Sequence, residues 1–387
     1  MKLLHCLPLV LFASFAHAAS IAVPTPDKVI QPIASPPSMA AVSYLLVDGA
    51  SGQILAESNS DAPVEPASLT KLMTAYLVEK ELKAGNISMG DPVPISVKAW
   101  KTEGSRMFVR EGTQVRLEDL LRGVIIQSGN DASVALAEYM AGTEEAFAEL
   151  MTAQAKALGM NQTQYFNSTG LPDQGHLTSA RDLAILARQI IYEHPDLYRI
   201  YSEKEFTYND IKQTNRNRLL WRDPSVDGLK TGHTNAAGYC LVASAERDGM
   251  RLITVVMGTD SADARERETA KLLNYGYRFF EGVTLYKSGQ VLDQTARVWG
   301  GEADQVTIAA AQDVYQVLPK GARDRLALDL QLTPELSAPI EQGQTLGSLT
   351  LSLDGKQLAQ VPVVASQPVP KGSLMKQAMD WVLRAMQ

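Results

Sequence analysis

The stretch Glu65-Pro66-Ala67-Ser68-Leu69-Thr70-Lys71 organises the rest of the chain. Proline is favoured at the first position of a helix, and neither glycine nor proline follows until Gly85. We therefore predict a helix that begins just before Ser68 and ends near Leu82. Residues three apart share a helix face, so the Ser68 hydroxyl lies near the Lys71 amine. A neutral amine in that place can turn the hydroxyl into a nucleophile.

This S-x-x-K pattern is a weak signal by itself. It also fits a capped surface helix, and a second match at Ser373-Leu374-Met375-Lys376 has nothing chemical around it. Two further motifs strengthen the first: Ser128-Gly129-Asn130, and later Lys230-Thr231-Gly232-His233. Three short motifs in this order, each at an element boundary, together indicate a serine–lysine active site.

Composition and charge limit the classes of protein that remain. The 387 residues are 45% hydrophobic and 20% charged, which suits two or three globular domains. The net charge of −7 argues against nucleic acid as a partner. Residues 1–18 combine Lys2, an apolar run and a terminal Ala-His-Ala, which predicts a signal peptide and an exported protein. Residues 19–40 are rich in Pro, Ala and Ser and are interpreted as a loose lead-in.

Only one cysteine, Cys240, remains after removal of the predicted signal peptide, so no intramolecular disulfide is possible. Two interpretations of Cys240 stay open, a reactive thiol and a small buried strand residue, and we favour the second.

Residues 41–283 show strand patterns at both ends and helix patterns between them. We predict strands at 42–48, 53–58, 206–208, 227–230, 239–246 and 252–258. We predict further helices at 117–125, 132–140, 144–158, 179–192 and 264–280. This order implies an α+β domain, in which one antiparallel sheet, built from both ends of the region, is flanked by helices and carries a helical insertion.

The pattern changes after Gly282. Short β-like runs alternate with turn signals, which predicts a small all-β domain at residues 284–368. Its expected strands are 297–299, 306–308, 315–318, 327–332, 345–353 and 360–364.

Residues 369–387 form the last predicted unit, an amphipathic helix that begins at Gly372. One broad arc of this helix is apolar: Leu374, Met375, Ala378, Met379, Trp381, Val382, Leu383, Ala385 and Met386. Sixteen residues are too few to span a bilayer but can lie in its interface. The alternative is a helix packed on the β domain. We favour the membrane, because the segment is terminal, net basic with Lys371 and preceded by prolines.

The whole mature chain resembles the low-molecular-mass penicillin-binding proteins, the D-alanyl-D-alanine carboxypeptidases of the penicillin-binding protein 5 and 6 type. Besides the β domain and the terminal helix, the matching segments are 66–71, 127–132, 215–217, 220–221 and 227–234. The resemblance implies a serine β-lactamase/transpeptidase-like fold and a periplasmic serine peptidase at the inner-membrane surface. Such an enzyme removes the terminal D-alanine from peptidoglycan stem pentapeptides through an acyl-enzyme and is acylated by β-lactams.

The resemblance makes Ser68 the nucleophile and Lys71 its base. A free lysine has a pKa of about 10.4, so a base working near pH 7 needs a drop of about three units. Burial and a second cation can supply it, and Lys230 is the obvious cation in the sequence. Ser128 would relay the proton to the leaving amine. The amide of Asn130 has both a donor and an acceptor, which suits orienting Lys71 and the substrate together.

The third motif is expected to bind the substrate. The resemblance places the two backbone N–H groups of the oxyanion hole at Ser68 and His233. It assigns the substrate carboxylate to Thr231, within the Lys230-Thr231-Gly232 segment and with help from Lys230.

Two arginines are further candidates for the carboxylate. Arg265 lies where the family has a carboxylate-binding arginine, and Arg216 lies in Asn-Arg-Asn before the third motif; the alternative for both is a solvated surface arginine. Arg218 stands where the family has a small residue, and the sequence suggests no role for it. The segment 104–108 resembles a loop bordering the site, or is a plain surface loop. We expect no cofactor and no metal ion.

Three other functions stay open: a class A-like β-lactamase, a D,D-endopeptidase acting on cross-links, and a non-catalytic penicillin-binding scaffold. Gly129 replaces the aspartate of the β-lactamase second motif, and no E-x-x-L-N signature follows. Both departures favour a carboxypeptidase over a β-lactamase. Sensor proteins usually carry transmembrane helices before the domain, and the sequence shows none there.

Overall fold

The computed structural model describes residues 34–386. The predicted signal peptide and most of the predicted lead-in lie outside this range. The rest of the lead-in runs beside helix α9 (Ala262–Phe279), where Tyr275 donates a hydrogen bond to the Ala34 carbonyl at 2.9 Å and Lys271 donates one to Ser38 at 3.1 Å.

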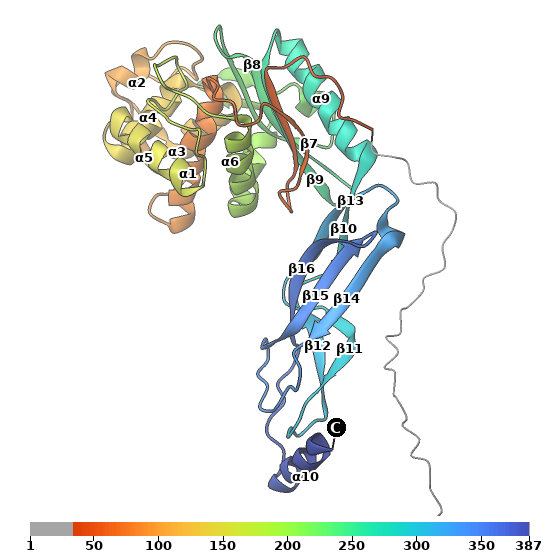
Figure 1. Ribbon diagram of the computed structural model, residues 1–387. Coiled ribbons are helices and arrows are strands. Elements are labelled where there is room, and N and C mark those ends of the chain that lie inside the picture. Colours follow the sequence, from red (N-terminus) through yellow and green to blue (C-terminus); the bar gives the residue numbers. More distant parts are fainter. Residues whose placement is uncertain (1–33, 387) are drawn as a thin grey trace, which may run out of the picture.

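The centre of the first part is a five-stranded antiparallel sheet in the order β2-β1-β9-β8-β7 (Figure 1). The strands are β1 (Ser43–Asp48), β2 (Ile54–Ser58), β7 (Val226–Thr234), β8 (Gly238–Arg247) and β9 (Met250–Thr259). Strand β1 pairs with β9 from Ser43 opposite Met257 to Asp48 opposite Leu252. The predicted sheet built from both ends of the region is confirmed.

Alternating residues of these strands face two different cores, as the two-residue period of a strand requires. Along β8, Cys240 and Val242 pack with the helical insertion, whereas Leu241 and Ala243 pack toward α9. Both faces of β8 are therefore buried, and Ser244 is the one polar residue in its buried stretch 240–245.

The insertion surrounds helix α1 (Lys71–Ala84), whose residues 71–79 are all buried. Its α-helices are α2 (Val97–Lys101), α3 (Leu117–Arg122), α4 (Asn130–Ala141), α5 (Glu144–Ala157), α6 (Ala180–Glu193), α7 (Pro195–Tyr198) and α8 (Leu219–Arg222). Its other helical turns are η1 (Ala67–Thr70), η2 (Gly123–Gln127) and η3 (Arg199–Ser202). Two small hairpins complete it, β3 (Pro92–Pro94) with β4 (Gln114–Arg116) and β5 (Glu205–Tyr208) with β6 (Ile211–Thr214). The predicted nucleophile helix exists, but Ser68 lies in the 3₁₀ turn η1 rather than in α1.

The second part is all β, as predicted. Strand β10 (Phe280–Tyr286) pairs with β13 (Val314–Pro319). A five-stranded sheet follows in the order β11-β12-β16-β15-β14. Its strands are β11 (Val291–Arg297), β12 (Gln305–Ala310), β14 (Leu326–Leu332), β15 (Thr345–Leu353) and β16 (Lys356–Ala365), and η4 (Arg323–Arg325) precedes β14. The expected boundary at 283/284 falls inside β10, so the division into domains stays a prediction.

The strand expected at 297–299 was wrong. The strand is β11, which ends at Arg297, and Trp299 makes only an isolated bridge to Ser337. A register shift lies between Val291 and Thr295, and Gln294, which strict alternation would bury together with Leu292 and Ala296, is exposed. The bulge breaks the alternation that sequence reading depends on.

The β part meets the sheet of the first part through the β10–β13 ribbon and extends away from it, with helix α10 (Leu374–Ala385) at the far end (Figure 1). The Tyr315 hydroxyl donates to the Asp48 carboxylate at 2.8 Å, and Val317 joins the core beneath α9.

Helix α10 turns its polar side, not its apolar side, to the β sheet. Asp380 is 4% exposed and accepts a hydrogen bond from the Gly300 N–H at 2.7 Å. Lys376 pairs with Asp380 and Asp304, and Arg384 pairs with Glu335. The large apolar residues Leu374, Met375, Met379, Trp381, Val382, Leu383 and Met386 are all exposed. Two of the basic residues that the sequence offered to lipid, Lys376 and Arg384, are thus held in ion pairs within the chain, whereas Lys371 is exposed.

None of the helices within residues 34–386 is long and apolar enough to cross a membrane.

Gly170 controls how closely the segment before α6 approaches η1, the turn that carries the predicted nucleophile Ser68 (the nucleophile turn). Its φ is +77°, and a Cβ there would lie 1.8 Å from the Ala67 carbonyl oxygen. We predict that Gly170→Ala lowers the free energy of unfolding by about 3 kcal/mol, because backbone strain adds to a clash with main chain. The matched control is Gly85→Ala, where φ is +75° and nothing lies within 4 Å, so only about 1 kcal/mol is lost. Urea unfolding measures both, and equal losses would contradict the role of the clash.

Candidate active site

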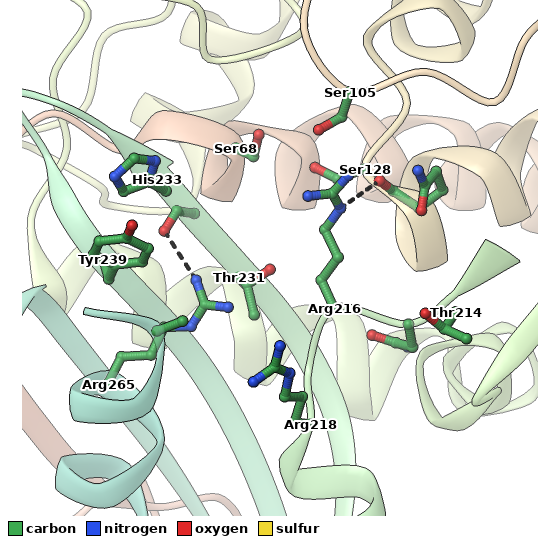
Figure 2. A pocket seen from close by; sticks show the side chains of 14 residues that line it. Ser68, Ser105, Ser128, Thr214, Arg216, Arg218, Thr231, His233, Tyr239 and Arg265 are labelled. Carbon is green, nitrogen blue, oxygen red and sulfur yellow. Dashed lines mark hydrogen bonds between the residues drawn. The ribbon is translucent and has the colours of Figure 1, made fainter.

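Ser68 opens into a polar cavity of about 500 Å³ between the sheet and the helical insertion (Figure 2). The other residues that line it are Ser105, Gln127, Ser128, Thr214, Asn215, Arg216, Arg218, Thr231, Gly232, His233, Tyr239, Ala262 and Arg265. All three sequence motifs therefore meet at one place. Lys71, Asn130 and Lys230 are buried beneath the lining rather than on it.

The third motif lies beside Ser68 because β7 is the edge strand of the sheet and η1 packs against it. Gly232 permits the close approach: a Cβ there would lie 3.0 Å from the Pro66 carbonyl oxygen and 3.4 Å from the Ala67 Cβ. Thr231 and His233 flank this glycine and line the same cavity as Ser68.

Lys71 contacts three oxygen atoms. Its Nζ lies 2.7 Å from Asn130 Oδ1, 2.6 Å from the Thr169 carbonyl and 3.2 Å from Ser68 Oγ. The amide and carbonyl oxygens can only accept, so they take two N–H groups. A neutral amine has only two N–H groups, so its lone pair is then directed at the Ser68 hydroxyl. The geometry suits proton transfer from Ser68 to Lys71.

Burial lowers the pKa of Lys71 to about 7, and the charge of Arg216 adds to this lowering. The Asp131 and Glu144 carboxylates act in the opposite direction. The sequence analysis gave the role of second cation to Lys230. In the structure, burial and the neighbouring Lys71, Arg216 and Arg265 charges hold the pKa of Lys230 well below its usual range. Arg216 is thus the cation acting on Lys71.

Ser128 and Asn130 stand on opposite sides of a break between helices. Ser128 follows η2 with φ +66°, and its buried Oγ has no hydrogen-bond partner within the described part of the chain. Asn130 opens α4, and its Nδ2 donates to the Glu103 carbonyl at 2.6 Å. This bond fixes the amide so that Oδ1 faces Lys71, and one of its two N–H groups is no longer available to a substrate.

The loop resembling a site-bordering segment does border the cavity. The Ser105 carbonyl accepts the Asn130 N–H at 2.7 Å. The buried Asp131 carboxylate accepts the N–H groups of Met107, Phe108 and Val109 at 2.8–3.2 Å. The second motif therefore holds this loop in place.

Both candidate arginines line the cavity. Arg265 is 8% exposed, its Nη1 lies 3.5 Å from the Gly232 carbonyl, and burial lowers its pKa. The Arg216 Nε donates to the Gln127 carbonyl at 3.0 Å. The His233 ring stacks against Tyr239 with centroids 3.9 Å apart.

Sequence reasoning missed three groups that support the site. The Thr169 carbonyl carries no sequence signal, because any residue could supply it. Asp131 was not among the expected site residues, although it lies within the matching segment 127–132. His176 shares a 2.9 Å hydrogen bond with Thr70, and burial lowers its pKa to about 4, so the ring is neutral and braces the nucleophile turn.

Cys240 is fully buried in β8, and burial raises its pKa to about 11. This favours the interpretation as a strand residue, since the thiolate is the reactive form.

The sheet, the insertion and the three motifs define a serine peptidase of the penicillin-binding class. The family model described as D-alanyl-D-alanine carboxypeptidase matches residues 30–261, and the penicillin-binding protein 5 C-terminal domain model matches residues 280–371. The chain belongs to the D-alanyl-D-alanine carboxypeptidase family, which confirms the resemblance, the fold class and the class of enzyme.

Similar proteins cover nearly the whole chain. D-alanyl-D-alanine carboxypeptidase DacA of Escherichia coli K12 is 42% identical over 96% of this chain and 92% of its own length. DacC of the same strain is 44% identical over 90% and 88%. Penicillin-binding protein 5 of Haemophilus influenzae has a solved structure with a TM-score of 0.80 and 42% identity, covering 87% of this chain and 100% of that one.

The effect of Arg216 on the Lys71 pKa can be tested by measuring how the acylation rate depends on pH. Lys71 is the predicted base, and a base must be neutral to accept a proton, so we expect the acylation rate to rise as pH increases through the Lys71 pKa of about 7. We predict that Arg216→Ala moves this acidic limb upward by about one unit, because loss of a nearby positive charge favours the protonated amine. Stopped-flow measurement of the acylation rate at saturating β-lactam reports this acidic limb without a contribution from β-lactam binding. Arg216→Lys keeps the charge and should leave the limb in place; an unmoved limb in the alanine variant would contradict the role of Arg216.

Proposed function

We propose that Ser68, Lys71 and Ser128 carry out the D-alanyl-D-alanine carboxypeptidase reaction of this family on peptidoglycan stem pentapeptides. The observation that carries this assignment is the Lys71 amine, with two oxygens that only accept and the Ser68 hydroxyl as its third neighbour. A base in that environment can accept the Ser68 proton near neutral pH.

In acylation, Ser68 Oγ attacks the carbonyl of the penultimate D-alanine while its proton passes to Lys71 Nζ. The negative charge on the carbonyl oxygen faces the backbone N–H groups of Ser68 and His233. The C–N bond then breaks, and the proton reaches the leaving amine through the Ser128 hydroxyl. The buried Ser128 Oγ supports this relay, because no group within residues 34–386 is hydrogen-bonded to it. Water then attacks the acyl ester while one of its protons passes to Lys71. The bond between Ser68 Oγ and the acyl carbon breaks, and Lys71 returns the proton to Ser68 Oγ.

The substrate carboxylate lies against the third motif in this proposal. Thr231 donates to it, Gly232 leaves room beside the nucleophile turn, and Arg265 and Arg216 supply positive charge from two sides. Lys230 is buried below, where a substrate carboxylate would favour its charged form. The same site accepts β-lactams; a similar structure, penicillin-binding protein D2 of Listeria monocytogenes in an ampicillin-bound form, is 30% identical over 62% of this chain, with a TM-score of 0.57.

The direct test is incubation with diacetyl-lysyl-D-alanyl-D-alanine, following free D-alanine. We predict that Ser68→Ala loses both D-alanine release and covalent labelling by a fluorescent penicillin, because within residues 34–386 Ser68 carries the one hydroxyl hydrogen-bonded to Lys71. Ser373→Ala, the matched change at the second S-x-x-K, should keep both. Labelling that persists in the Ser68 variant would refute the assignment.

A D,D-endopeptidase is the second candidate. A protein named D-alanyl-D-alanine endopeptidase from Pseudomonas aeruginosa is 32% identical, but over only 60% of this chain. Release of separated cross-link fragments, rather than free D-alanine, would identify that activity.

We further propose that residues 1–18 direct export and that α10 holds the protein at the periplasmic face of the inner membrane. The outward apolar side of α10 supports this, since Met375, Trp381 and Met386 are more than 70% exposed. Fully burying a large apolar side chain contributes about 1.5–3 kcal/mol. Because Lys376 and Arg384 are held in ion pairs, the attachment depends mainly on this apolar area.

We predict that deleting residues 372–387 moves the protein from the membrane to the soluble periplasmic fraction while hydrolysis of small peptides is kept. The reason is distance, because α10 lies at the opposite end of the molecule from the cavity (Figure 1). Fractionation and immunoblotting measure the first effect, and D-alanine release measures the second. A truncated protein that stays with the membrane, or fails to fold, would show that α10 has a structural role instead.

A further inference from the structure

The cavity holds more positive charge than one carboxylate can neutralise. Three arginine side chains line it, Arg216, Arg218 and Arg265, and none of its lining residues within the described chain is acidic. A peptide ending in D-alanine brings a single carboxylate. In the proposed function Thr231, Arg265 and Arg216 serve that group, and the Arg216 Nε also donates to the Gln127 carbonyl. Arg218 is left without a role.

Arg218 is well placed to bind something. It directly precedes α8 and follows the buried Asn217, whose side chain donates to the Gly228 carbonyl at 2.9 Å and accepts from the Leu219 N–H at 3.2 Å. These bonds fix the backbone on both sides, while the side chain is 60% exposed and lines the cavity. The base of the side chain is therefore rigid and its guanidinium is accessible.

The partner that Arg218 has within the chain is weak. Its Nη1 lies 3.6 Å from Asp263 Oδ1, at the start of α9, and both side chains are more than half exposed. Exposed ion pairs of this kind contribute little. A carboxylate entering the cavity can replace Asp263 with a closer, two-pronged contact.

Figure 2 shows Arg218 near Thr231, between Arg265 and Arg216. If Thr231 and Arg265 hold the terminal carboxylate of the substrate, the departing residue lies in the same cavity that Arg218 lines. The methyl group of alanine cannot accept a hydrogen bond from a guanidinium, whereas the carboxylate of an acidic side chain can.

We propose that Arg218 forms a second carboxylate-binding subsite, which selects departing D-residues with an acidic side chain. The inference rests on the proposed function, because it needs the terminal carboxylate to lie at Thr231. It extends the substrate class from peptides ending in D-alanine to those ending in a D-residue with two carboxylates.

The test compares diacetyl-lysyl-D-alanyl peptides that end in D-glutamate or D-glutamine, which have similar shape and differ by one charge. We expect the wild-type kcat/KM to be about tenfold higher for D-glutamate, as a charge-assisted contact provides. In Arg218→Ala this ratio should fall to about one. Because the two peptides are compared in the same protein, any effect of the substitution on the cavity that is common to both cancels in the ratio of their kcat/KM values. A ratio that is the same in both proteins, or no release of D-glutamate by either, would overturn the proposal.

Two control variants separate contact from long-range attraction. Arg267→Ala removes the same charge from α9 at an exposed residue that does not line the cavity, and should leave the ratio unchanged. Asp263→Asn removes the carboxylate that competes for Arg218. It should raise the D-glutamate to D-glutamine ratio about two- to threefold, which is the effect expected from losing one exposed ion pair. A fall in Arg267→Ala equal to that in Arg218→Ala would refute a contact.

The peptide ending in D-alanine separates the two proposals. If the wild type releases no D-alanine, the proposed function is wrong and this inference falls with it. If D-alanine is released normally while the D-glutamate to D-glutamine ratio does not depend on Arg218, only the subsite is wrong.

Discussion

The structure depends on keeping one amine, that of Lys71, buried beside a hydroxyl and able to lose its proton near neutral pH. Burying a charged group without a partner is costly, so such an amine titrates near neutrality instead. Two oxygens that only accept fix its N–H groups, and each oxygen must itself be held. Asn130 is held by the Glu103 carbonyl, and Gly170 allows the Thr169 segment to pass against the Ala67 carbonyl. The helical insertion around α1 thus supplies the residues that bury the Lys71 amine and accept its N–H groups.

The same constraint explains why the edge of the sheet lies at the site. Strand β7 offers its free edge to the nucleophile turn, and Gly232 removes the side chain that would keep them apart. The hydroxyl, its base and the residues expected to bind the carboxylate then line or underlie a single cavity. Arg216 disfavours the charged form of Lys71, and it also lines the cavity that we propose binds the substrate carboxylate.

Much of the fold and of the candidate active site could be predicted from the sequence. Ser68, Ser128 and Thr231 came from local motifs, and the sheet built from both chain ends came from strand patterns with period two. Other features carried no such signal. The Thr169 carbonyl is backbone, the cation acting on Lys71 depends on how the Arg216 loop folds back, and the bulge in β11 hides its alternation. The sequence also showed that α10 is amphipathic, but not that its polar side would pair with Asp304 and Glu335.

Direct titration of the Lys71 amine tests the central claim most closely. Lysine labelled with ¹³C at Cε reports its charge state by NMR, and Lys71→Arg identifies the signal by its absence. We expect the Lys71 resonance of the unliganded protein to titrate with a pKa of about 7. A value near 10, as for a solvated lysine, would mean that the amine is charged at neutral pH, and the assignment of Lys71 as the base for Ser68 would be wrong.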